Sequence, residues 1–305
     1  MSFPILASTF ANNILPIILL SAAGFALGKL LHIDARSLGR VVFYVFSPVL
    51  IFDLLIQNEL EIGEAAIVIA FALCFIGMMG LLTWVIGYLL KLERTVLVSI
   101  LITTMFANTG NYGLPLVAFA FGEQALSYAG IYFITTTLLF YTFGVFLASL
   151  GQMSFREAVL GLFRIPTMYA VLLAILINTW NIEIPLSVSR AVELAAGGTI
   201  PLMLILLGVQ LTSLEFSGNP RAMQLSISLR MVIAPLAALL FAALFGLQDS
   251  TRQAGVTQAS MPSMVSATVL ATEYNLDAKL VTAVVFISTL LSPLTLTPLL
   301  VFLRR

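Results

Sequence analysis

The chain is poor in charged residues. Asp, Glu, Lys and Arg make up only 9% of its 305 residues, whereas a typical soluble domain contains about 25%. Hydrophobic residues make up 60%, and the mean hydropathy is +1.09. The 14 basic and 14 acidic residues cancel and form no basic run, so nucleic acid is not an expected partner. The composition predicts a polytopic membrane protein that has the lipid bilayer as its surroundings.

Histidine and cysteine are almost absent. With one histidine, His32, a zinc site or a Ser–His hydrolase is hard to build. The sequence also lacks HExxH and the phosphate loop GxxxxGKS/T, which argues against a metalloprotease and an ATP-driven pump. We therefore expect no enzyme, no metal and no cofactor other than a coupling H⁺ or Na⁺. The single cysteine, Cys74, lies in an apolar run and is expected to pack there.

Long polar loops are missing as well. About 20 apolar residues cross a bilayer, and charges and turn residues divide the chain into ten expected membrane-spanning helices. They are 9–31, 36–57, 65–90, 95–121, 125–150, 156–179, 186–213, 221–246, 251–273 and 277–303. Of the 14 Lys and Arg residues, all but Arg190, Arg252, Arg304 and Arg305 then fall on one side. Because positive residues stay inside, we expect a plasma-membrane protein with both termini outside.

A shift of half the chain length aligns several features. Pro48 falls on Pro201, Gln57 falls on Gln210, and FITT at 133–136 falls on FIST at 286–289. The alternative is chance matching among repetitive apolar residues. We expect two five-helix repeats, 1–152 and 153–305. Because five is odd, the repeats would be inverted relative to each other, as in many secondary transporters.

The fourth expected span is interrupted. FANTGNYGLPLVAFAFG, residues 106–122, places Asn108, Gly110, Asn111, Gly113 and Pro115 where an apolar run should continue. Proline removes a backbone donor and clashes with the preceding turn, and glycine tolerates unwound backbone. Freed backbone groups at this depth are tolerated only inside protein or beside a cavity. The stretch therefore predicts a cavity.

The ninth span, at the matching position of the second half, is interrupted too, by Gln258, Ser260, Pro262, Ser263 and Ser266. Paired interruptions point to the binding site of a transporter. The alternative is two ordinary proline kinks, with Asn and Ser side chains bonding neighbouring helices.

The run NTGNYGLPL resembles the motif of the auxin efflux carrier family, the bacterial relatives of the plant PIN-FORMED carriers, which have a bile acid/auxin transporter-type fold. The resemblance implies a scaffold domain of helices 1, 2, 6 and 7, and a transport domain of helices 3–5 and 8–10. It implies broken helices 4 and 9 that cross, with Pro115 and Pro262 as the crossover prolines, elevator-type alternating access, and a homodimer. The long cytoplasmic loop of the plant proteins is absent, and many bacterial relatives look like carriers of small carboxylates such as malate or malonate.

At such a crossing, the second halves of the two helices would begin near Gly113 and Ser263. Helix N-termini carry partial positive charge and free N–H groups, which favours a carboxylate. Asn108, Asn111 and Gln258 would add hydrogen bonds, and the expected substrate site also includes Tyr112, Pro115 and Pro262. This would be an anion site without a buried arginine. Arg230 lies about a turn and a half into its span, from where it could snorkel to the cytoplasmic surface.

Asp53 is the candidate for ion or proton coupling. An ionisable residue inside a span costs about 2.5–3.5 kcal/mol on insertion scales, so it needs a partner or a role. The alternative is an aspartate wetted at the outer interface. Gln57 and Gln210 either line the cavity or only pack, and Glu193 is either a coupling residue or interfacial.

The expected function is secondary active transport of a small organic anion, either a carboxylate or an auxin-like acid, as a symporter or otherwise driven by the proton gradient or the membrane potential, with Na⁺ coupling left open. An anion channel and a sensor that binds without transport are the open alternatives, because broken helices also line pores.

Overall fold

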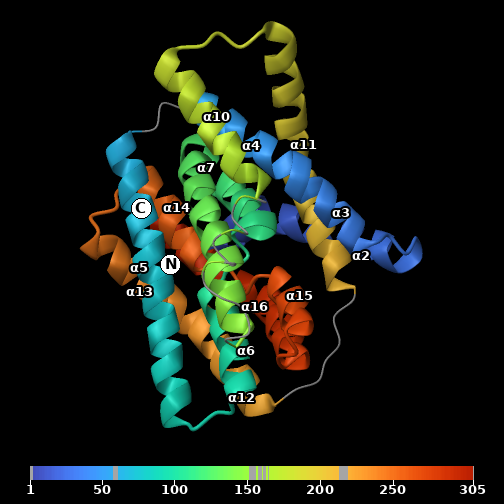
Figure 1. Ribbon diagram of the computed structural model, residues 1–305, viewed down its shortest axis with the longest axis vertical. Coiled ribbons are helices and arrows are strands. Elements are labelled where there is room, and N and C mark those ends of the chain that lie inside the picture. Colours follow the sequence, from blue (N-terminus) through green and yellow to red (C-terminus); the bar gives the residue numbers. More distant parts are fainter. Residues whose placement is uncertain are drawn as a thin grey trace.

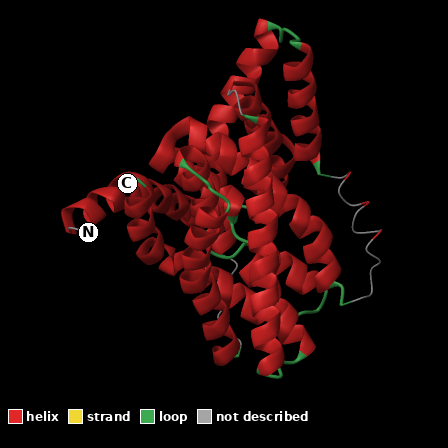
Figure 2. Cartoon of the chain, turned by 90° about the vertical axis from the view of Figure 1, so that its left-hand side faces the viewer, coloured by secondary structure: helices red, strands yellow, loops and turns green. Residues whose placement is uncertain are grey.

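The computed structural model describes residues 3–57, 61–150, 156, 160, 163, 165–212 and 219–304. These residues form helices and their connections (Figures 1 and 2). Seven helical stretches are long and apolar enough to cross a membrane: Phe3–Leu30, Ala35–Gln57, Gly63–Leu89, Thr109–Ala148, Leu186–Leu211, Pro220–Leu244 and Ala278–Leu303. The regular structure of the described residues is thus helical throughout, and the chain is a multi-pass membrane protein.

Several of these stretches combine α-helices with short π-helical turns, labelled η. In the first half these are α1 (Phe3–Thr9), η1 (Phe10–Ile14), α2 (Leu15–Leu30), α3 (Ala35–Val41), η2 (Val42–Phe46), α4 (Ser47–Gln57), α5 (Ile62–Leu89), α6 (Arg94–Met105), η3 (Thr109–Gly113), α7 (Leu114–Leu139), η4 (Phe140–Gly144) and α8 (Val145–Ala148). In the second half they are α10 (Pro166–Trp180), α11 (Leu186–Leu211), α12 (Pro220–Ser228), η6 (Leu229–Ile233), α13 (Ala234–Leu244), α14 (Asp249–Ala259), α15 (Ser266–Glu273) and α16 (Ala278–Leu303).

The remaining expected spans coincide with shorter or interrupted helices. Span 95–121 covers α6, η3 and the start of α7, and span 251–273 covers α14 and α15. Within α7, Gly122 has φ +79° and ψ −166°, so two helices follow one another there. The predicted repeat boundary at 152 and 153, and most of the start of span 156–179, lie outside the described residues. The count of ten and the inverted repeat stay predictions.

One set of helices packs through small residues. A Cβ atom on Gly24 of α2 would collide with the backbone of Ile205 on α11, and one on Gly208 of α11 would collide with the backbone of Ser21. Small residues allow such close approach of helix backbones in membranes. Helix α4 packs against α11, and α10 packs against α4. We call α2, α4, α10 and α11 the seam group.

A second set packs around buried aromatic side chains. Phe71 and Phe75 of α5 lie within ring-stacking distance of each other, and Phe71 also meets Tyr132 of α7 and Phe245. Helix α14 packs against α7 and α13, and α16 packs against α6 and α15 (Figure 1). We call α5, α6, η3, α7 and α12 to α16 the crossing group.

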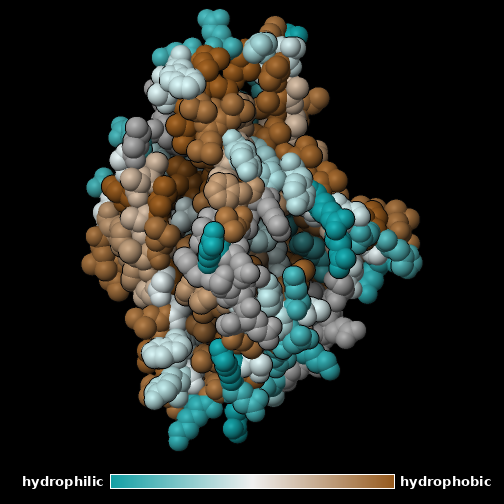
Figure 3. All heavy atoms as spheres, viewed as in Figure 1, coloured by the Kyte–Doolittle hydropathy of each residue, from teal (hydrophilic) through white to brown (hydrophobic). Residues whose placement is uncertain are grey.

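The outer surface is apolar. Leu81, Leu194, Leu236 and Leu294 are all more than half exposed, and Figure 3 shows large brown areas on the upper and left-hand parts of one face. Such a surface suits lipid. Cys74 is exposed on α5, so the expectation that it packs inside was wrong, because the helix turns that residue outward.

The two ends of the chain meet. Arg304 donates to Asn13 Oδ1 at 3.0 Å, and the N and C labels lie close together in both ribbon views (Figures 1 and 2).

Candidate functional site

The two predicted interruptions are bonded to each other. Asn108 N donates to Pro262 O at 2.8 Å, and Met264 N donates to Phe106 O at 3.0 Å. They flank an antiparallel bridge between Ala107 and Ser263. Backbone groups that leave a helix inside a membrane must find other partners, and here the two interrupted segments supply partners for one another. We call residues 106–113 and 257–266 the crossing.

The local sequence explains where the helices stop and restart. Pro115 lies in the first turn of α7, where its missing N–H breaks no helical bond. Gly113 N donates to Asn108 O at 3.0 Å and closes η3. In the second interrupted segment, Pro262 has no backbone N–H to donate, but its carbonyl oxygen accepts from Asn108 N. Helix α15 starts at Ser266, three residues after the predicted restart at Ser263, because Ser263 is held in the bridge.

Neighbouring helices hold the crossing through side chains. Ser263 Oγ donates to Thr103 O at 2.7 Å, and Ser263 N donates to Ser288 Oγ of α16 at 3.2 Å. Tyr112 Oη lies 2.8 Å from Ser292 Oγ, also on α16. The hydroxyl groups of Ser263 and Tyr112 are therefore already bonded within the protein.

Other polar atoms of the crossing are buried without partners. Of the six such side-chain atoms found among the described residues, four belong here: Asn108 Nδ2, Thr109 Oγ1, Thr257 Oγ1 and Gln258 Oε1. Each unpaired group costs about 1–3 kcal/mol. The set contains an amide donor, two hydroxyls that can donate, and an amide acceptor. These four groups can form hydrogen bonds with a polar ligand, and none of them carries a charge.

Gly113 lets the two interrupted segments pack closely. A Cβ atom at position 113 would collide with Gln258 Oε1, so only glycine lets the amide of Gln258 lie against η3. Gln258 Nε2 in turn donates to Ala129 O at 3.1 Å. The second interruption thus lies against η3 and is bonded to α7 beyond Gly122.

Asn111 lies at the boundary between the two helix groups. It is partly buried, and its Nδ2 donates to Gln210 Oε1 of α11 at 3.4 Å. Both residues were predicted separately, one for substrate and one for coupling, and the structure brings them into contact.

Arg230 corrects the sequence interpretation. It lies in η6 with no exposed surface. Its Nε donates to Met261 O at 2.7 Å, its Nη1 to Thr104 O at 3.1 Å and its Nη2 to Ala259 O at 2.8 Å. Both the expected snorkelling and the expected absence of a buried arginine were wrong. A lone arginine between SISL and MVIAP was a signal for burial, but its partners lie too far along the chain for the sequence to name them.

The acidic candidates lie on the seam group. Asp53 near the end of α4 accepts from Gln57 at 2.7 Å, and Glu193 of α11 accepts from Ser189 at 3.0 Å. Each of these bonds stays within its own helix. Asp53 is also within electrostatic range of Glu193 and Glu123.

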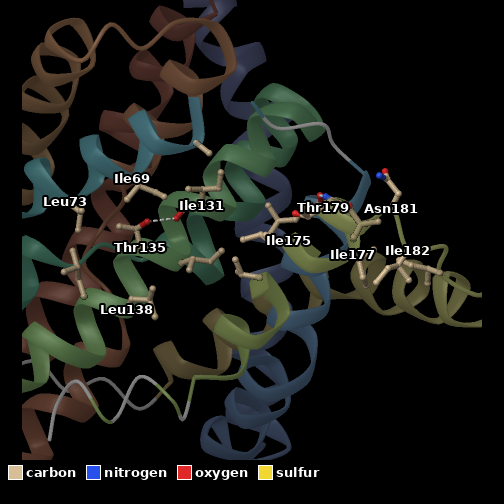
Figure 4. A pocket seen from close by; sticks show the side chains of 18 of the residues that line it. Ile69, Leu73, Ile131, Thr135, Leu138, Ile175, Ile177, Thr179, Asn181 and Ile182 are labelled. Carbon is tan, nitrogen blue, oxygen red and sulfur yellow. Dashed lines mark hydrogen bonds between the residues drawn. The ribbon is translucent and has the colours of Figure 1, made fainter. Parts of the chain in front are cut away.

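A hollow of about 1500 Å³ lies away from the crossing, between α4, α5, α7 and α10 (Figure 4). Apolar side chains such as Ile69, Ile131 and Ile175 line it, with Thr135 and Asn178 among the few polar ones. None of its described lining residues belongs to the crossing. The cavity expected from the interruption therefore does not coincide with this hollow, because the freed backbone groups bond one another. The apolar lining suits lipid chains better than an anion.

Comparison with known proteins agrees with the motif. The family described as "Membrane transport protein" matches residues 9–300. An "Uncharacterized transporter" of Methanothermobacter thermautotrophicus is 31% identical over 292 residues, which cover 93% of this chain and 94% of that protein. A protein of Rhizobium meliloti named "Putative malonate transporter" is 24% identical over 308 residues, which cover 95% of each chain. The chain therefore belongs to the auxin efflux carrier-type membrane transport family.

Proposed function

We propose that this protein is a secondary transporter of a small organic anion, with malonate as the first candidate, and that the anion binds at the crossing. The observation that carries the proposal is the set of four unpartnered polar atoms beside two helix interruptions that are bonded together. Membership of a transport family and the name of the relative from Rhizobium meliloti support it.

The crossing offers an anion both dipoles and hydrogen bonds. Helices α7 and α15 begin a few residues after the two bridged segments, and a helix N-terminus carries about half a positive charge. The Asn108 amide and the hydroxyls of Thr109 and Thr257 can donate to carboxylate oxygens. A small dicarboxylate would satisfy several donors at once, which a larger, more apolar acid such as an auxin would do less well.

Movement would take place between the two helix groups. The backbone contact of α2 with α11 makes the seam group a stiff support, whereas Asn111 and Gln210 meet across the boundary at 3.4 Å. We propose that the crossing group slides along the seam group as an elevator, that both groups come from two inverted five-helix repeats, and that seam groups pair in a homodimer. The antiparallel direction of the two interrupted segments supports the inverted repeat.

For coupling we propose Asp53. It is partly buried and shares a hydrogen bond with Gln57, so it can take up and release a proton at the boundary between the groups. We further propose that the protein lies in a bacterial plasma membrane with both termini outside.

The experiment is malonate counterflow in proteoliposomes, which compares wild type with Asn108→Ala. Asn12→Ala is the matched control, because Asn12 is exposed on η1. Among the described residues, its side chain donates only to Ser8 Oγ, at 3.3 Å. We expect saturable exchange in wild type and in the control, and a loss of at least about tenfold in Asn108→Ala, since one lost bond to a charged group is worth about 1.5–3 kcal/mol. Flux that does not saturate would indicate a channel, and binding without flux would indicate a sensor. Either result would contradict the proposal.

A further inference from the structure

Three backbone carbonyls from two different helix ends converge on one side chain. Thr104 O belongs to the last turn of α6, Ala259 O ends α14, and Met261 O lies just beyond it. The guanidinium of Arg230 donates a hydrogen bond to each of the three, at 2.7 to 3.1 Å. The first halves of both broken helices therefore end on the same cation.

The charges at this point balance. The C-terminus of a helix carries about half a negative charge, so the ends of α6 and α14 together carry about one. The last carbonyls of a helix also lack intrahelical donors. One guanidinium supplies one positive charge and a rigid fork of donors. Arg230 thus neutralises the C-terminal ends of α6 and α14.

Unwound carbonyls and helix C-termini at such a crossing are also the groups that bind a coupling cation in secondary transporters. The π-helical turn η6 places Arg230 among them, and the arginine has no exposed surface. We propose that Arg230 is a tethered cation that occupies the cation position of the crossing, so that this carrier assembles its anion site without bound Na⁺. The part of this inference that concerns transport rests on the proposed function. The part that places Arg230 at the cation position of the crossing does not depend on the proposed function.

The first test measures the occupancy of the position without any transport. The melting temperature of the purified, full-length protein is recorded for wild type, Arg230→Ala and Arg221→Ala, with millimolar guanidinium chloride, urea, sodium chloride or choline chloride. Arg221 is the matched control, because it is exposed at the start of the same helical stretch. A ligand that binds only the folded state raises the melting temperature.

We expect guanidinium to raise the melting temperature of Arg230→Ala, whereas urea and choline should not. Guanidinium should leave the melting temperatures of wild type and Arg221→Ala unchanged. Urea has a similar shape without the charge, so the difference isolates the cation. The proposal would be overturned if Na⁺ raised the melting temperature of wild type. It would also be overturned if guanidinium left the melting temperature of Arg230→Ala as unchanged as that of Arg221→Ala. If Arg230→Ala does not fold, Arg230→Lys takes its place: its ammonium keeps the charge but cannot fork to three carbonyls, so partial destabilisation is expected, and wild-type stability would contradict the proposal.

The second test measures malonate uptake into proteoliposomes with Na⁺ replaced by choline. We expect uptake by wild type to be unchanged, uptake by Arg230→Ala to fall at least tenfold, and guanidinium to restore part of it. A merely structural role of Arg230 would not give rescue by the small cation. Uptake by wild type that requires Na⁺ would overturn the proposal. Absence of any uptake by wild type would count against the proposed function. The melting-temperature test alone would then decide whether Arg230 occupies the cation position.

Discussion

The seam group and the crossing group solve the problem of packing helices in a membrane in opposite ways. At Gly24 and Gly208, helices α2 and α11 approach until their backbones touch, and no hydrogen bond is needed. At the crossing, α6 and α14 stop, and their ends are held by bridge hydrogen bonds, by Ser263 and by the fully buried Arg230. The first contact depends on shape, and the second depends on polar groups.

This difference separates stability from function. A contact between close-packed backbones has essentially one arrangement, because interiors resist changes in volume. A polar crossing with four unpartnered atoms can exchange partners with water or a ligand. We therefore expect substitutions in the seam to affect folding first, and substitutions in the crossing to affect transport first.

The largest effect is expected from Gly208→Ala. The added Cβ would meet the backbone of Ser21 and Phe25, which cannot rotate away, so the helices must separate. We expect a loss of at least about 2 kcal/mol in the free energy of unfolding, at the upper part of the range for overpacking. Gly197→Ala on the same helix is the matched control, because nothing lies within 4 Å of its added Cβ, and it should gain about 0.5–1 kcal/mol from helix propensity. Thermal unfolding in detergent measures both, and equal behaviour of the two variants would refute the close contact.

The same substitution at the crossing should have the reverse profile. In Gly113→Ala the Cβ meets Gln258 Oε1, the end of a side chain that can move. Displacing the amide breaks the bond from Gln258 to Ala129 O, which costs about 1 kcal/mol of stability. Malonate uptake should fall at least tenfold, because the unpartnered atoms are rearranged. A variant that transports like wild type while it loses stability would place the substrate elsewhere, and the Asp53 region would become the next candidate.

Much of this contrast was visible in the sequence. Pro115, Pro262 and the glycines around Asn111 marked both interruptions, because proline and glycine act on their own backbone. The boundaries of the long helices followed from charges and turn residues. Even the seam left a trace, since Gly24 and Gly28 are spaced four apart in GFALG.

The partners of the polar groups could not be predicted. The bridge between Ala107 and Ser263 is made by backbone atoms, which any residue carries. Arg230 bonds carbonyls of residues 104, 259 and 261, so its role appears only once the chain is folded. The repeat shift placed Asn111 and Gln210 in different halves and gave no sign that they meet.

The smallest expected effect concerns pH, and it separates the two groups electrostatically. Residues 106–113 and 257–266 contain no Asp, Glu, His or Lys, whereas Asp34 caps the N-terminus of α3, which packs against α11 of the seam group. Hydrogen bonds from the Ser37 side chain and from the backbone N–H groups of Arg36 and Ser37 lower the pKa of Asp34 below its ordinary value of 3.8. A lowered pKa means that the charged form stabilises the folded state. This contribution is fully present above the ordinary pKa and is lost as the pH falls through the folded value.

Asp34→Ala should therefore melt slightly below wild type at neutral pH, and the two melting curves should converge as the pH drops below 3.8. The difference between Gly113→Ala and wild type should not change over the same range, because no acid titrates at the crossing. A pH-dependent difference for Gly113→Ala would mean that Asp53 or another carboxyl group acts on the crossing from the seam group, and the two groups would then be coupled electrostatically as well as through Asn111.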